Sequence, residues 1–486
     1  MRTVIRVSCA LLVAIGAAGA TIAAQAKTPA WAPQVDKVFS QWDRRDSPGC
    51  ALGVFENGAI AYERGYGMAD IEHDVPIAPD SVFYVGSLSK QFTAMAAALA
   101  VQQGKLSPDD SIRKYLPELP DYATAIKVRH LIHHTSGLRD YNTLLSIAGR
   151  RGDEAYDNPT VLRMTARQRS LNFQPGAEYL YSNTGYTLLA IVVERATGSP
   201  FAAFADAHIF RPLGMTASHF HVDASRMVKN RAMAYAPAGA GRDVQLDTPS
   251  NERAGAGGVF TSVRELLRWD NNFYDGRVGG KPLVETLHAT EPLGDGKPST
   301  YAWGLMIGMY RGLKLVEHSG SLGGYRAHLL RFPDQRTSVA ALCNMGSINP
   351  GGLAREVADL ALGPRLTEVK TAPRATTGAG STQPAAAAAG ASGPLTDYPG
   401  EYHSDEIDAT FTVSIDGDRL MLRRESDAAP AAFQPGTGDL YRARGMTVRF
   451  ERGTDGKVTA LVVDAGRVRD IRFSRLPESK PRMDTD

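Results

Sequence analysis

The spacing of hydrophobic residues predicts a helix and then a hairpin near the start of the chain. The helical pattern consists of four apolar residues that recur at intervals of three and four: Val35, Val38, Phe39 and Trp42. Two strand-like runs then lie on either side of Asn57-Gly58, a dipeptide typical of two-residue hairpin turns. We therefore expect a helix followed by a β-hairpin within residues 50–67.

Strand patterns return only after a long stretch with helical periodicity. Residues 87–290 have a mainly helical pattern, and three strand-like runs follow at 313–320, 325–333 and 338–345. Strands at both ends with helices between them indicate one antiparallel sheet closed by the two ends of the segment. We predict an α/β (α+β) fold in which this sheet is flanked by helices and carries an all-helical insertion.

A change in composition separates this fold from the rest of the chain. Residues 368–394 are rich in Ala, Gly, Ser, Thr and Pro and have almost no large apolar side chains, which is typical of a flexible linker. An alanine-rich helix is the alternative, but the flanking glycines and prolines disfavour it. Beyond the linker, alternating apolar residues between Asp-Gly and Ala-Gly turns predict a small all-β barrel or sandwich with a short polar tail over 395–486.

The first 26 residues have the pattern of a signal peptide. Two arginines precede an apolar run of small residues, 7–24, and Ala24-Gln25-Ala26 has the form of a signal-peptidase site. A membrane anchor is the alternative, but the run is rich in Ala and Gly and only weakly apolar. We expect removal of residues 1–26 on export to the periplasm or the outside of the cell. No stable membrane span would remain, and the first folded domain would cover 27–367.

The balance of charge excludes two classes of partner for the exported chain, and its two cysteines raise the question of a disulfide. Removal of residues 1–26 takes away two arginines and no acidic residue, which leaves equal numbers of basic and acidic residues. Without an excess of one charge the chain has no field to recruit nucleic acid or an anionic lipid surface, so neither is an expected partner. Cys50 and Cys343 remain. An oxidising compartment permits a disulfide between them, but two cysteines so far apart in sequence favour separate buried thiols.

The first candidate for chemistry is the Ser-x-x-Lys sequence from Ser87 to Lys90, within "VGSLSKQFTAMA". Ser87 lies where a strand-like run meets a helix, and Lys90 falls on the same helical face one turn later. In a dry site, desolvation would lower the pKa of Lys90 and make a neutral amine available to take the serine proton. Taken alone, the pair is better explained as a helix N-cap and a solvated lysine. A second pair, Ser111 and Lys114, lies among charged residues and is typical of an exposed helix start.

Two further segments carry chemistry-bearing side chains. Tyr181-Ser182-Asn183 follows a Pro-Gly turn and precedes an apolar helix, and His318-Ser-Gly320 lies at a strand end beside glycines that permit close approach of two backbones. A tyrosine can transfer protons, an asparagine amide can hold a substrate carbonyl, and a strand edge can offer N–H groups. We therefore expect the three segments to meet at one site.

The motifs S-x-x-K, Y-x-N and H-x-G, in this order, resemble those of the penicillin-recognising serine hydrolases. The resemblance is greatest to the branch that contains class C β-lactamases, D-Ala-D-Ala carboxypeptidases, D-aminopeptidases and related esterases. It spans roughly residues 35–362, with further similar text at 130–141, 209–215 and 255–269. The resemblance implies a β-lactamase/transpeptidase-like fold and a serine hydrolase that works through an acyl-enzyme.

The resemblance also implies a role for each matching residue. Ser87 would attack a carbonyl carbon, and Lys90 and Tyr181 would exchange the proton, with either of them as the general base. Asn183 would bind the substrate amide or order Lys90. His318 and Gly320 would lie beside the substrate, and the oxyanion would accept hydrogen bonds from the backbone N–H groups of Ser87 and Ser321.

His318 departs from the β-lactamase pattern, which generally has lysine in its place. Histidine has an ordinary pKa of about 6.5 and is mostly uncharged at neutral pH, so a substrate carboxylate would find a weaker cation there. The resemblance therefore implies hydrolysis of an amide or ester bond. The expected substrate is a small molecule or short peptide, foremost a peptide or amide that contains a D-amino acid, or an ester. Fragments of the cell wall belong to this class. The alternatives are a class C-like β-lactam hydrolase, a penicillin-binding sensor that is acylated without turnover, and a binding module in the C-terminal domain beside a vestigial hydrolase.

The sequence contains no complete motif for an α/β-hydrolase, a phosphate-binding loop or a metal site. There is no G-x-S-x-G nucleophile elbow, and the glycines at 255–258 are not followed by the Gly-Lys-Ser/Thr of a P-loop. Instead, Ser262 and Glu265 have the spacing of a helix capping box. His130, His133 and His134 have the spacing of metal ligands but lack an H-E-x-x-H motif, so we expect positioning and packing roles for them, no metal and no cofactor.

Overall fold

The computed structural model describes residues 28–150, 156–239, 243–250, 252–367 and 393–477. We refer to residues 28–367 as the N-terminal domain and to 393–477 as the C-terminal domain. The predicted signal peptide and all but the last two residues of the predicted linker lie outside the described residues.

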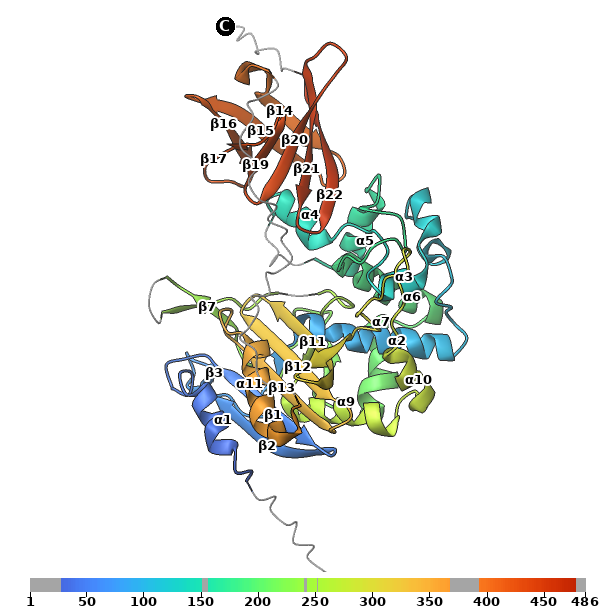
Figure 1. Ribbon diagram of the computed structural model, residues 1–486, viewed down its shortest axis with the longest axis vertical. Helices are drawn as coiled ribbons and strands as arrows, with labels where there is room; N and C mark the ends of the chain where they lie inside the picture. The colour runs from blue at the N-terminus through green and yellow to red at the C-terminus, as the bar shows by residue number, and fades with distance from the viewer. Residues whose placement is uncertain (1–27, 151–155, 240–242, 251, 368–392, 478–486) are drawn as a thin grey trace, which may run out of the picture.

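A six-stranded antiparallel sheet forms the centre of the N-terminal domain (Figure 1). Its order is β10-β11-β12-β13-β1-β2, with β1 Cys50–Glu56, β2 Ala59–Tyr66, β10 Met306–Tyr310, β11 Leu313–Leu322, β12 Tyr325–Phe332 and β13 Thr337–Cys343. The first and the last of these strands along the chain, β1 and β13, pair side by side. The predicted antiparallel sheet closed by its two ends is therefore confirmed. The turn between β1 and β2 has positive φ at both Asn57 and Gly58, as a primed two-residue hairpin requires.

Helices cover both faces of this sheet. On one face, α1 (Ala32–Phe39) and α11 (Pro350–Leu362) pack together over Leu52 and Val54 of β1. Ala51 belongs to the apolar core on the opposite face, because side chains alternate along a strand. That face is covered by α9 (Val263–Asp275) and by the helical region. Ser262 caps α9 through the N–H of Glu265, but the Glu265 carboxylate accepts from Ala217 N instead of closing a capping box.

A disulfide joins Cys50 of β1 to Cys343 of β13. The expectation of two separate thiols is therefore wrong. The physical reason is the strand register: the two residues are 293 positions apart in sequence, but they lie directly opposite each other in the antiparallel pair, with their Cα atoms 4.0 Å apart. Sequence separation alone does not reveal such a pairing.

Helix α2 (Lys90–Gln102) lies in the middle of the helical region and packs against α6 (Asn183–Thr197). Its residues from Lys90 to Ala100 are buried on every side, whereas an amphipathic surface helix would bury one face. The remaining helices are α3 Val128–Ile132, α4 Tyr141–Ile147, α5 Asn158–Ala166, α7 Phe201–Ala205, α8 Arg211–Leu213 and α10 Gly280–Leu287. Short strands accompany them, including the sheet of β5 Phe83–Tyr84, β9 Val259–Thr261 and β6 His219–Phe220.

Within the described ranges, no single helix has the length and apolar character needed to cross a membrane. One pair of helices, 183–197 and 201–213, meets the criterion only when taken together, and the pair bends by 80° between its two parts.

The C-terminal domain is a nine-stranded antiparallel sheet that curves into a nearly closed barrel. The predicted all-β architecture is confirmed. Aromatic side chains fill its interior, including Tyr402, Phe411, Phe450 and Phe473. The strands are β14 Gly400–Ser404, β15 Ala409–Asp416, β16 Arg419–Arg424, β17 Ala431–Ala432, β18 Gln434–Pro435, β19 Leu440–Ala443, β20 Met446–Arg452, β21 Val458–Ala465 and β22 Val468–Arg475.

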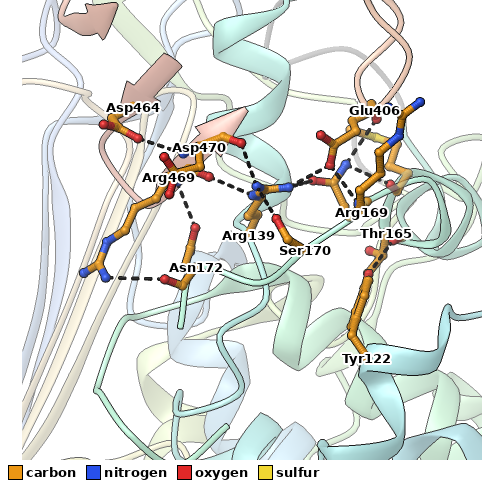
Figure 2. Close-up of polar contacts among 12 residues, drawn as sticks. Tyr122, Arg139, Thr165, Arg169, Ser170, Asn172, Glu406, Asp464, Arg469 and Asp470 are labelled. Atoms are coloured by element: carbon orange, nitrogen blue, oxygen red, sulfur yellow. Dashed lines mark hydrogen bonds and ion pairs between the residues drawn. The ribbon is translucent and has the colours of Figure 1, made fainter. Parts of the chain in front are cut away.

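The C-terminal domain docks on α4 and α5 of the N-terminal domain, where apolar side chains of both helices join its core (Figure 1). The fully buried Arg139 connects the two domains through polar contacts. Its guanidinium donates to the carboxylate of Glu406 at 2.7 Å and to the carbonyl oxygens of Arg469 and Asp470 at 2.9 and 3.0 Å (Figure 2). A buried arginine is costly unless acceptors satisfy its charge and N–H groups. Because these acceptors belong to the C-terminal domain, the contact favours this one arrangement of the two domains.

We expect the double substitution Cys50→Ser, Cys343→Ser to lower the free energy of unfolding by about 2–4 kcal/mol, because the disulfide restricts the unfolded chain across a long loop. Urea unfolding of the double variant and its parent measures the difference. Peptide mapping without reductant should recover Cys50 and Cys343 as one linked pair. Two separately alkylated peptides from the unreduced protein would contradict the disulfide.

Candidate active site

Ser87 lies in a 3-10 turn, η1 (Gly86–Ser89), between strand β5 and helix α2. It is neither an N-cap nor part of the first α-helical turn, so the simpler interpretation as a helix cap does not describe it. The turn packs closely against the end of β11. A Cβ on Gly86, whose φ is +54°, would lie 2.3 Å from the backbone nitrogen of Ser321, and a Cβ on Gly320 would lie 1.9 Å from the carbonyl oxygen of Val85. Glycine at both positions permits this approach of two backbones.

Lys90 begins α2, and its amine is completely buried beside Ser87. The Nζ atom lies 3.1 Å from Ser87 Oγ, 2.9 Å from Asn183 Oδ1 and 2.8 Å from the carbonyl oxygen of Ala256. Burial lowers the pKa of Lys90 well below its ordinary range, and the nearby carboxylate of Asp140 opposes this shift only in part. The amine is therefore neutral at a lower pH than that of an exposed lysine.

Tyr181 precedes α6 and lies close to both Lys90 and His134. The Lys90 nitrogen is 4.7 Å from the centroid of the Tyr181 ring, and the His134 ring packs against the same tyrosine at 4.2 Å. Burial raises the pKa of Tyr181, although a hydrogen bond with Ser87 acts in the opposite direction. At neutral pH the phenol of Tyr181 therefore carries its proton.

Asn183 is the first residue of α6, and its place depends on a buried carboxylate. Its side-chain oxygen faces Lys90, while its backbone N–H donates to Asp140 Oδ2 at 2.6 Å. The other oxygen, Asp140 Oδ1, accepts from the N–H of Thr143 in the first turn of α4. One carboxylate thus holds the N-terminal ends of two helices, where negative charge is favourable.

His318 lies on β11 and is almost completely buried. Its Nε2 atom is 3.0 Å from the Tyr301 hydroxyl, and its Nδ1 atom is 2.6 Å from the carbonyl oxygen of Ser319. Burial above all, and then the charge of Lys90, lowers the pKa of His318 to about 3. The imidazole is therefore neutral at physiological pH.

These residues line one open cavity of about 450 Å³. The structure brings six of the residues predicted for the site to its wall: Ser87, Tyr181, Asn183, His318, Gly320 and Ser321. Lys90 lies directly behind Ser87. The wall also includes residues that the sequence did not reveal, among them Tyr84, Tyr141, Asn142, Tyr179, Arg253, Met306 and Arg467. Tyr141 closes the family-like text at 130–141 and could have been found there, whereas Arg467 lies in an ordinary Ala-Gly turn of the C-terminal domain.

The three histidines between 130 and 134 each have a separate structural contact. His130 Nδ1 accepts from the N–H of Lys127, His133 Nδ1 lies 3.1 Å from the carbonyl oxygen of Tyr301, and His134 Nδ1 accepts from the N–H of Ser182. Across the described ranges, one group of three metal-ligating side chains comes together, and it lies elsewhere, at Asp70, Glu72 and His73.

The second Ser-x-x-Lys sequence has a different environment. Ser111 caps the short helix η2 (Ile112–Lys114) by accepting from the N–H of Arg113, and Lys114 pairs with Asp110 at 3.0 Å on the surface. Ser111 therefore serves as an internal control for Ser87.

Two family models match the chain. The model described as Beta-lactamase matches residues 35–363, and a second, described as Domain of unknown function (DUF3471), matches residues 384–475. The first covers nearly all of the N-terminal domain, and the second most of the C-terminal domain.

Relatives and solved structures agree with the first match. A D-aminopeptidase from Gluconobacter oxydans (strain 621H) is 28% identical over 305 residues, which are 62% of this chain and 56% of the relative. Penicillin-binding protein 4* from Bacillus subtilis (strain 168) is 29% identical over 305 residues, which are 60% of this chain and 66% of the relative. The alignments thus span less than two thirds of either relative.

An octameric penicillin-binding protein homologue from Pyrococcus abyssi shares the fold over 91% of this chain and 98% of its own, with a TM-score of 0.59 and 22% identity. The expected β-lactamase/transpeptidase-like fold is therefore confirmed. The Beta-lactamase match extends over more than half of the chain and includes Ser87, Lys90, Tyr181 and His318, as the three motifs predicted. The chain belongs to the β-lactamase family of serine hydrolases.

Proposed function

We propose that the protein cleaves amide or ester bonds through an acyl-enzyme on Ser87. The observation that carries this proposal is the contact of 3.1 Å between Ser87 Oγ and the buried amine of Lys90, at the wall of an open cavity. A serine beside a desolvated amine can lose its proton as it attacks a carbonyl carbon. The proposed reaction requires neither a metal ion nor an organic cofactor.

The pKa shifts of the two candidate bases favour a division of roles. Lys90, whose pKa is lowered, takes the proton of Ser87 Oγ while the oxygen bonds to the carbonyl carbon. Tyr181, whose pKa is raised, gives its proton to the leaving nitrogen or oxygen as the old bond breaks, and Lys90 returns a proton to the phenolate. Water then attacks the acyl-enzyme by the reverse path and releases the acid. Asn183 keeps the Lys90 amine aimed at Ser87.

The developing oxyanion would bind between the backbone N–H groups of Ser87 and Ser321. The close approach at Gly86 and Gly320 supports this assignment, because it brings the η1 turn and the end of β11 together at the cavity wall. Loss of one such donor typically costs about 3–4 kcal/mol of transition-state stabilisation.

The substrate that fits best is a short peptide or amide with a D-amino acid, or an ester. Several relatives are named D-aminopeptidase, which supports the peptide class. A β-lactam ranks second, because the neutral His318 offers no cation to a β-lactam carboxylate at the position where β-lactamases generally have lysine. Export through residues 1–26 remains part of the proposal, and the Cys50–Cys343 disulfide supports it, since such bonds persist in oxidising compartments.

Substitution of the proposed nucleophile is the direct test. We expect Ser87→Ala to abolish labelling by a fluorophosphonate probe, because no other serine has an adjacent buried amine within the described residues that line the cavity. The matched control is Ser111→Ala, which should be labelled as the parent is. Undiminished labelling of the Ser87→Ala protein would remove the proposal.

Substrate class is resolved by steady-state turnover of a panel with Ser87→Ala as the blank. We expect D-amino-acid amides, D-Ala-D-Ala peptides or p-nitrophenyl esters to be hydrolysed faster than nitrocefin, since His318 is neutral. Faster turnover of nitrocefin would reverse the order of the two substrate classes. A burst of acylation without a steady state would identify a sensor that is acylated but not released.

The pH profile of labelling tests the role of Lys90. The rate should rise with pH as the amine loses its proton, with an inflection well below the ordinary lysine pKa of about 10.4. Lys90→Arg keeps the charge at every pH, so we expect it to lose the rise and about 10²–10⁴-fold in rate. His318→Gln is the control, because a group with a pKa of about 3 does not titrate in this range. Disappearance of the inflection in His318→Gln would assign it to the imidazole instead.

A further inference from the structure

A hairpin of the C-terminal domain reaches the wall of the candidate active site. The turn between β21 and β22 contains Arg467, which lines the same cavity as Ser87. The Arg467 side chain is about one third exposed (31%), so it is accessible from the cavity. The site is therefore built by both domains.

Contacts on both sides of the turn fix its position. Asn172 of the N-terminal domain donates to the carbonyl oxygen of Arg467 at 3.0 Å and accepts from the N–H of Arg469 at 2.9 Å. Arg139 donates to the Arg469 carbonyl oxygen (Figure 2). The Arg469 guanidinium pairs with Glu178 at 3.0 Å. The backbone around Arg467 is thus held in place before any ligand binds.

The Arg467 guanidinium lies close to both Asp140 and Tyr181. Its Nη2 atom is 3.2 Å from Asp140 Oδ1, and its central carbon is 5.4 Å from the centroid of the Tyr181 ring. Asp140 already accepts hydrogen bonds from the N–H groups of Asn183 and Thr143. In the part of the chain that the structure describes, Nε and Nη1 of Arg467 have no hydrogen-bond partner. These two donors are therefore free to hydrogen-bond an acceptor such as a carboxylate oxygen.

The other basic side chains at the cavity are less suited to bind an anion. His318 is neutral, and the amine of Lys90 is surrounded by three protein acceptors. The guanidinium of Arg253 is almost completely buried and lies over the rings of Tyr141 and Tyr156, at 5.3 and 5.7 Å. Arg467 combines permanent charge with access from solvent.

We propose that Arg467 binds the free α-carboxylate of a short peptide substrate and so determines specificity from the C-terminal domain. The inference rests on the proposed function for the identity of the cavity as an active site. The Asp140 carboxylate pairs with Nη2 and leaves Nε and Nη1 available to a ligand in the cavity that Arg467 lines.

A purely structural role is the competing explanation, in which Arg467 only neutralises the buried Asp140. The two roles predict different binding. Loss of a structural arginine would weaken all ligands alike, whereas loss of a carboxylate-binding arginine would weaken only ligands that carry the carboxylate.

The experiment measures binding of D-alanyl-D-alanine and of its C-terminal amide to the full chain with Ser87→Ala, which prevents turnover. We expect the acid to bind more tightly than the amide by about tenfold or more, the usual effect of a charge-assisted pair. Adding Arg467→Gln should remove this preference, and Arg467→Lys should keep part of it. The matched control is Arg442→Gln, an exposed arginine on β19 of the same domain, which should leave the preference unchanged.

Equal affinity of the Ser87→Ala protein for acid and amide, or no measurable binding of either, would overturn the proposal. An equal loss of affinity for both ligands in Arg467→Gln would also overturn it in favour of the structural role. Failure of the proposed function is visible separately. Preference for the acid without fluorophosphonate labelling at Ser87 would support the carboxylate site but not the hydrolase. Labelling at Ser87 without the preference would support the hydrolase but not the carboxylate site.

Discussion

The burial of one amine, Lys90 Nζ, is the constraint on which the arrangement of the site depends. A buried amine without partners is costly, and three acceptors from separate segments surround this one: Ser87, Asn183 and Ala256. To place these acceptors around the amine, the start of α6 and the glycine-rich loop before β9 must both lie against the first turn of α2. The same burial lowers the pKa of the amine. The group that organises the packing is thus also the one suited to accept a proton.

The central sheet supplies the second half of the site through close backbone contact. Gly86 and Gly320 let the 3-10 turn and the end of β11 approach to distances that no side chain would allow. The position of β11 depends in turn on its neighbours β12, β13 and β1, and hence on the pairing of strands from opposite ends of the domain. The serine side chain and the opposing strand end are therefore brought together by the whole fold.

Features set by local pattern could be predicted from the sequence, and features set by tertiary contact could not. The hairpin at Asn57-Gly58 follows from the backbone preferences of these two residues. The order of the three motifs, by its resemblance to a known family, predicted that Ser87, Tyr181 and His318 share one site, and all three line one cavity. The Cys50–Cys343 pair depends on the register of two strands at opposite ends of a domain, which spacing does not encode. Arg467 occupies an ordinary turn, and only the docking of the second domain through Arg139 gives it a place at the cavity.

The location of Arg467 on a separate module has a consequence for how such proteins diversify. The groups proposed to break the bond are encoded in one part of the gene, and the charged tip of the β21–β22 turn in another. Exchange of the accessory module, or mutation of its loop tip, could redirect the choice of ligand while the reacting groups stay intact. Selection could then act on preference and on reactivity independently.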